Sequence, residues 1–201
     1  MGDILLTLEK FYDENPKLLR LNLAQFYCGE IFCCRFYKMP NYHQQIFAGV
    51  VNKGSPFIKS FILFDINIGQ SNIFWANVNK SHSSWPDLNS LCLGKLHMNE
   101  DSVNFVVSNV TAVGSKINTL WLRGLKYPVY KDRLFLYKSI QNSTNVLKSV
   151  FFEDLILNET EMATNFFMML KKMDGLKSLV LKTCHFNSDV LNQMFPKAYL
   201  E

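Results

Sequence analysis

Hydrophobic residues recur at the same five offsets in six segments of the chain. In each segment of 11 residues, the apolar side chains stand at offsets 0, 3, 5, 8 and 10 from the first residue. The segments are 18–28, 58–68, 88–98, 117–127, 147–157 and 176–186, so their starts lie 40, 30, 29, 30 and 29 residues apart. Apolar residues two positions apart are typical of a half-buried strand, and each segment therefore predicts a short strand.

The residues between these segments predict a turn and a helix in each unit. Offset 11 carries residues that turn a chain or cap a helix: Gly29, Gly69, Asn99, Pro128, Asn158 and Asn187. Apolar residues at helical spacing follow in the third and fifth units: Val103, Val106, Val107 and Val110, then Met162, Phe166, Met169 and Leu170. Asn158, with Glu161 three residues later, predicts a capping box at the start of the second of these helices.

This pattern resembles the leucine-rich repeat, LxxLxLxx(N/C)xL. Units of 29–30 residues with helices are similar to the ribonuclease-inhibitor-like class, and SWPDLNSLCL (84–93) and DGLKSLVLKTCHF (174–186) look like the repeats of F-box leucine-rich-repeat proteins. The resemblance implies an α/β fold, a curved solenoid of about six repeats with parallel strands on its concave face and helices on its convex face. The chain departs from the family at offset 8, where only Cys184 is the expected Asn or Cys.

The repeats divide the chain into two parts. Residues 1–15 are expected to form an N-terminal helix, as a cap or a partial repeat, and residues 16–201 the repeat domain. The first interval exceeds the others by about ten residues, which fall near Ile31–Pro40 and form either a convex-side insertion or an extra strand. No F-box-like helical module precedes the repeats, and no polar cap follows them. The chain is therefore expected to be part of a longer protein, a truncated product, or a protein that pairs at this end with a partner.

Composition narrows the class of protein. The 201 residues are 48% hydrophobic and 19% charged with a net charge of +4, which excludes a disordered tail. A run of Lys and Arg is missing, so no nucleic-acid partner is expected. Apolar runs such as 61–64 are far shorter than the ~20 residues that cross a bilayer, so no membrane partner is expected either. The start of the chain does not resemble a signal peptide, which favours a cytoplasmic or nuclear protein over a secreted one.

Residues that would carry chemistry are scattered. The five cysteines show no CxxC spacing, so neither a disulfide framework nor a zinc site is expected. The motifs HExxH, GxSxG, GxxxxGK[ST] and GxGxxG are missing, and the four histidines are dispersed along the chain. We therefore expect no catalytic, metal or cofactor site and no enzyme activity.

The informative surface is the strand face that alternation directs away from the core. Trp121 and Phe151 on adjacent predicted strands, with Arg123 nearby, are residue types that dominate binding energy at interfaces. Charges on this face lean positive, with seven basic residues against Asp65, Glu153 and Asp154. Cys92 is expected to be more exposed there than Cys28, which occupies a core position of the pattern. The predicted partner-binding residues of this concave face are Ile62, Phe64, Cys92, Trp121, Arg123, Phe151, Glu153, Val180 and Lys182.

Two functions are compatible with this reading. The first is a protein–protein recognition module that binds a protein partner in its concave groove. By family analogy it would recognise substrates for an F-box-type ubiquitin ligase, whose components would be further partners. The alternative is a leucine-rich-repeat fragment of an innate-immune or regulatory receptor that serves sensing or autoinhibition.

Overall fold

Five parallel strands form the main sheet, and their order in the sheet is their order in the sequence, β1-β2-β3-β4-β6. The computed structural model describes residues 41–55, 58–64, 73–80, 85–127, 129–142 and 147–194. The strands are β1 Ser60–Phe64, β2 Ser90–Gly94, β3 Thr119–Arg123, β4 Ser149–Glu153 and β6 Ser178–Lys182. Each begins two residues into a predicted segment, so an α/β fold and these five strand positions are confirmed.

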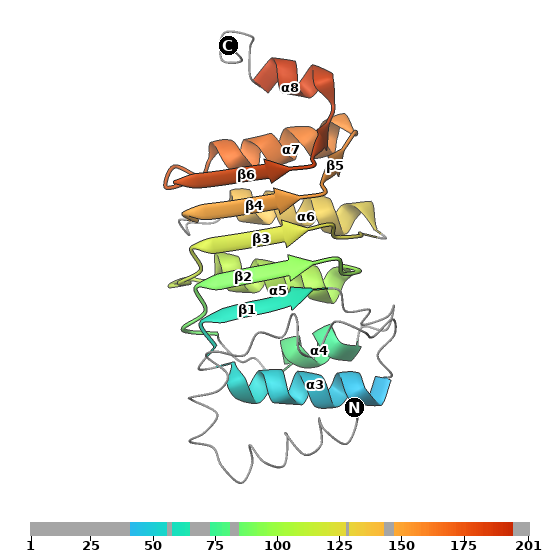
Figure 1. Cartoon of the computed structure of the whole chain (residues 1–201), viewed down its shortest axis with the longest axis vertical. Helices are drawn as coiled ribbons and strands as arrows, with labels where there is room; N and C mark the ends of the chain where they lie inside the picture. Colours follow the sequence, from blue (N-terminus) through green and yellow to red (C-terminus); the bar gives the residue numbers. More distant parts are fainter. Residues whose placement is uncertain are drawn as a thin grey trace.

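Helices alternate with the strands along the chain. They are α3 Asn41–Gly54, α4 Ile73–Lys80, α5 Glu100–Thr111, α6 Tyr130–Gln141, α7 Thr160–Lys171 and α8 Ser188–Met194. Each helix packs against the next one along the chain, and Figure 1 shows α5, α6 and α7 together behind the sheet. A second parallel ladder pairs β5 (Ile156–Leu157) with β7 (His185–Phe186), which the sequence pattern did not predict.

The core lies between the sheet and the helices. The residues at offsets 3 and 5 of β2, β3 and β4 are 5% exposed or less, and each such side chain stabilises the fold by about 1.5–3 kcal/mol when fully buried. Helix residues meet them directly, since the ring of Phe152 in β4 packs edge-on to Phe166 of α7 at 4.8 Å. Phe61 of β1 meets Phe105 of α5 in the same way at 5.8 Å. The hydrophobic repeat therefore marks core positions in β1 to β4, whereas Leu179 and Leu181 at the same offsets of β6 are 42% and 37% exposed.

The chain turns after each of four strands through a residue with positive φ: Lys95, Gly124, Asp154 and Thr183, at 52°, 52°, 57° and 52°. At the first three, the backbone N–H donates to the last residue of the following strand, for example from Lys95 to the carbonyl of Arg123 at 2.8 Å. This left-handed turn therefore extends the ladder beyond the strand. Of the four, only glycine adopts this conformation without a steric penalty.

Two helix starts differ from each other in how they are capped. At α5 the side chain of Asn99 accepts the N–H of Ser102 at 3.0 Å, and the Ser102 hydroxyl accepts the N–H of Asn99 at 2.7 Å. The capping box predicted at Asn158 is wrong, because α7 starts at Thr160 and no side chain caps it. The carboxylate of Glu161 instead accepts a hydrogen bond from Tyr130 of α6 at 3.2 Å.

Several expectations fall outside the described residues. These are the N-terminal helix of residues 1–15, the first predicted strand in 18–28 and the insertion at Ile31–Pro40. In the described ranges, no helix has both the length and the apolar character needed to cross a membrane.

Candidate functional site

The sheet face opposite the helices carries three rows of residues that run across the strands in register. None of the described helices lies over this face (Figure 1). The first row is hydroxylic, the second mostly apolar and the third charged at three of its positions. The rows are Ser60, Ser90, Thr119, Ser149 and Ser178; Ile62, Cys92, Trp121, Phe151 and Val180; Phe64, Gly94, Arg123, Glu153 and Lys182. Every predicted partner-binding residue therefore belongs to the second or third row, and we call this surface the open face.

The aromatic pair lies in the middle of the apolar row. The rings of Trp121 and Phe151 are 6.0 Å apart and inclined by 46°, a tilted contact between neighbouring strands. Both side chains are half-buried, and Val180 beside them is 40% exposed. Because an uncovered sheet face normally presents polar side chains to water, this row has the character of a contact surface.

Cys92 differs from its expected state. It occupies the predicted row, but only 6% of its surface is exposed, which is too little for a partner-contacting side chain. Its register neighbours are Ile62 and Trp121, and both are larger side chains on adjacent strands. Burial raises the pKa of the Cys92 thiol, and a contact with the Ser90 hydroxyl opposes that shift. Cys92 is therefore part of the floor of the open face.

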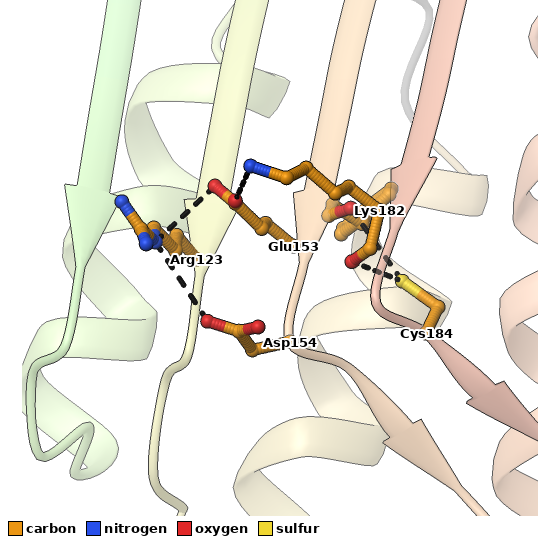
Figure 2. A network of polar contacts seen from close by, with 6 residues as sticks. Arg123, Glu153, Asp154, Lys182 and Cys184 are labelled. Atoms are coloured by element: carbon orange, nitrogen blue, oxygen red, sulfur yellow. Dashed lines mark hydrogen bonds and ion pairs between the residues drawn. The ribbon is translucent and has the colours of Figure 1, made fainter.

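The charged row is an ion network centred on a buried carboxylate, shown in Figure 2. One oxygen of Glu153 lies 2.6 Å from the Lys182 ammonium, and the other lies 3.2 Å from Nε of Arg123. The carboxylate of Asp154 lies 3.7 Å from the same Nε. Beside the network, the Cys184 thiol donates to the carbonyl of Lys182 at 3.4 Å.

The charged side chains of this network differ in their exposure to solvent. The side chain of Glu153 is 8% exposed, whereas those of Arg123 and Lys182 are 37% and 68% exposed. A buried carboxylate is tolerated only when cations and hydrogen bonds compensate its lost hydration. Glu153 therefore holds the two cations at the open face, and the cations are the groups within reach of a partner.

The remaining charges around the open face keep its positive balance. Lys59, Lys148 and Lys177 stand one residue before their strands and are exposed. Among the described acids of this region, Glu153 is buried and Asp154 is exposed. Arg20 and Asp65, which the sequence also assigned to this surface, lie outside the described residues. The described part of the open face therefore carries more basic than acidic side chains.

Two hollows near Arg133 were not predicted. They have volumes of about 170 and 390 Å³, and the guanidinium of Arg133, with Tyr127 and Ile156, lines both. Arg133 donates to the carbonyl of Ile156 at 2.6 Å and to the Tyr137 hydroxyl at 3.2 Å. Burial raises the pKa of Tyr127 and of Tyr137, so both phenols are neutral at physiological pH. Arg133 and Tyr137 are four residues apart on one helix, and this spacing is the sequence feature that could have predicted their contact.

Arg133 has a structural role in this arrangement. Its guanidinium lies 5.7 Å from the ring centre of Tyr127 and 5.9 Å from that of Tyr137, which are cation–π distances. Together with its bond to Ile156, these contacts tie α6 to β5.

Within the described ranges, no three His, Cys, Asp or Glu side chains come together as metal ligands. Comparison of the chain with protein-family models, curated proteins and solved structures finds no match. The class of the protein is therefore defined by its own fold and surface. It is an α/β protein whose parallel sheet has no described helix over one face and lines that face with aromatic and basic residues.

Proposed function

We propose that the chain is a leucine-rich-repeat solenoid that recognises a protein partner with its open face. Strands that start 30, 29, 30 and 29 residues apart, each flanked by a helix, support this architecture. So does the packing of each helix against its successor, which is how repeat proteins bury their apolar faces. In this proposal the open face is the concave surface and α3–α8 lie on the convex side.

The observation that carries the function is the pairing of Trp121 and Phe151 at 6.0 Å on the open face. Aromatic side chains at the centre of a surface, surrounded by polar residues, are the usual anchors of protein interfaces. Here the hydroxyl row lies on one side of the aromatic pair and the charged row on the other. The partner inserts apolar side chains against the aromatic rings and places acidic groups near Lys182 and Arg123.

The resemblance to F-box repeats gives this recognition a biological setting. The module would select substrates for a ubiquitin ligase in the cytoplasm or nucleus, where its thiols remain reduced. It would act by binding rather than by catalysis. The charge of the open face favours substrates that present an acidic segment with apolar residues.

The test compares three forms of the chain as bait for affinity purification followed by mass spectrometry. The double variant Trp121→Ala/Phe151→Ala removes the anchors. Phe135→Ala is the matched control, because Phe135 is a 47% exposed aromatic side chain on α6. We expect the parent and the control to enrich the same proteins, and the double variant to lose them while its thermal unfolding changes little.

Two results would overturn parts of the proposal. Equal capture by the double variant and the parent would show that the open face does not bind the partner. Enrichment of receptor components, without cullins, Skp-type adaptors or substrates of their ligases, would keep recognition by the open face and replace the ubiquitin-ligase setting with that of a receptor.

A further inference from the structure

A row of polar residues borders the open face at the amino ends of the strands. Its members stand one residue before the hydroxyl row, and we call it the amino-end row: Lys59, Asn89, Asn118, Lys148 and Lys177. Each of the last four donates its backbone N–H to the carbonyl of the member before it, at 2.8 or 2.9 Å. The amino-end row therefore continues the register of the sheet by one residue.

The amino-end row contains ammonium and amide groups but no carboxylate. Lys148 and Lys177 are exposed, and within the described ranges no acidic side chain lies at ion-pair distance from either. Asp174, three residues before Lys177, is also exposed and belongs to none of the ion pairs among described residues. By contrast, the ammonium of Lys182 at the other end of β6 lies 2.6 Å from the carboxylate of Glu153. The two ends of the open face therefore differ in how their cations are compensated.

Lys148 and Lys177 are neighbours in the amino-end row, and we call them the lysine pair. The N–H of Lys177 donates to the carbonyl of Lys148 at 2.8 Å, and adjacent strands lie about 4.8 Å apart. Like charges at facing positions of neighbouring strands repel each other, so an anion placed between them is attracted by both. Ser149 and Ser178 follow directly, are half-buried and pair in register. Two ammonium and two hydroxyl groups, all able to donate to a carboxylate, therefore lie together on two strands.

We propose that the lysine pair binds an acidic stretch of the protein partner, and that this contact sets the acidic specificity of the open face. The inference rests on the function proposed above, because the partner is the one anchored at Trp121 and Phe151. Phe151 stands three residues after Lys148, about 10 Å along β4. The partner therefore carries carboxylates about 10 Å from the apolar group that it places on Phe151, which is three residues of an extended segment or two turns of a helix.

The cations at the carboxyl end of the open face contribute less to this specificity. Arg123 pairs with the carboxylates of Glu153 and Asp154, and Lys182 pairs with Glu153, as Figure 2 shows. A partner acid that approaches these cations is repelled by both carboxylates and competes with them for the same donors. At the lysine pair no described carboxylate opposes it. The acidic contact is therefore stronger at the lysine pair.

The test measures binding of a fluorescein-labelled random copolymer of glutamate and tyrosine to the full chain, by fluorescence anisotropy at low salt. This probe presents acids and aromatic rings at every spacing. Lys148→Glu/Lys177→Glu reverses the charge of the lysine pair. Lys126→Glu/Lys131→Glu is the matched control, because both lysines are exposed, lie outside the open face and give the same change in net charge. The urea midpoint of each variant shows that it is folded, and Lys148→Gln/Lys177→Gln replaces the reversed variant if its folding is impaired.

We expect the parent to bind the copolymer and the control to bind it within about twofold of the parent. The reversed variant should bind it at least about tenfold more weakly. Trp121→Ala/Phe151→Ala should bind the copolymer no better than it binds poly-L-glutamate, because the probe's aromatic rings lose their contact.

The outcomes separate this inference from the proposed function. Equal weakening by the two lysine variants would overturn the inference, since it would indicate attraction to net charge alone, and would leave the aromatic anchors in place. Parent-like binding by the aromatic variant would contradict the proposed function, and the inference falls with it. A parent that does not bind the copolymer, or that binds a single-stranded oligouridylate more tightly, would also overturn the inference.

Discussion

The carboxylate of Glu153 lies 2.6 Å from the ammonium of Lys182, yet the two side chains are 8% and 68% exposed. The ion pair therefore joins a buried carboxylate to an exposed ammonium. The energetic consequence is asymmetric. Loss of the acid leaves cations that water can hydrate, whereas loss of the cations leaves a buried charge without compensation.

A mutant cycle should show this asymmetry. We expect Glu153→Gln to lower the free energy of unfolding by about 1 kcal/mol or less, because its partners are exposed. Arg123→Met/Lys182→Met should lower it by about 3 kcal/mol, because the carboxylate remains buried. Adding Glu153→Gln to that double variant should restore most of the loss. Urea denaturation measures the free energy of unfolding of all three variants. If the loss in the triple variant equalled the sum of the losses in Glu153→Gln and in the double variant, the network would be contradicted.

The left-handed turns predict opposite effects at two equivalent positions. Thr183→Asn should raise the free energy of unfolding by about 0.5 kcal/mol, because a β-branched residue disfavours positive φ and asparagine tolerates it. Gly124→Ala should lower it by about 1 kcal/mol. A Cβ at Gly124 would lie 3.5 Å from the Asp154 carboxylate, an ordinary contact, so the loss is conformational. Thermal unfolding tests both, and shifts of the same sign would refute the common turn geometry.

Alkaline pH should destabilise the chain through Tyr137. Burial raises the pKa of its phenol above the usual range, so the stabilisation is complete below pH about 10. Above that pH the unfolded chain releases a proton that the folded chain retains, and stability falls by about 1.4 kcal/mol per pH unit. Tyr137→Phe should reduce the total slope by about this amount between pH 10 and 11 in urea titrations, while Tyr127, whose pKa burial also raises, continues to contribute. Phe135→Tyr, which adds an exposed phenol on the same helix, should leave the slope unchanged.

The burial of Cys92 predicts its reactivity. In the folded chain a thiol reagent should label Cys92 slowly, because the side chain is 6% exposed and its pKa is raised by burial. Trp121→Ala should increase the labelling rate of Cys92 several-fold, because Trp121 is its register neighbour. Peptide mapping separates Cys92 from the other cysteines. An unchanged rate in Trp121→Ala, or an equal increase in Phe135→Ala, would show that other residues protect the thiol.

Features that depend on one strand alone were predictable. Leu91 and Leu93 stand two positions apart, and their offsets recur in the other segments, so both the strand and its buried face followed from the pattern. The position of Trp121 next to Phe151 followed in the same way, because parallel strands with equal spacing bring equal offsets together.

Features that depend on contacts between elements were not predictable. Cys92 is buried by its environment on neighbouring strands, which a single strand pattern does not contain. The carboxylate of Glu161 bonds Tyr130 31 residues away instead of capping its own helix. Of the four left-handed turns, only Gly124 had a residue type that signalled one.

The strand order β1-β2-β3-β4-β6 gives the sheet a single line of connection. A defect in β3, for example a cavity in place of Leu120, interrupts that line at its centre and leaves the packing of α5 against α6 to join the two halves. The same defect in β6 removes only the last layer. Tolerance to mutation is therefore set by how many layers lie beyond the damaged strand as well as by how deeply the side chain is buried.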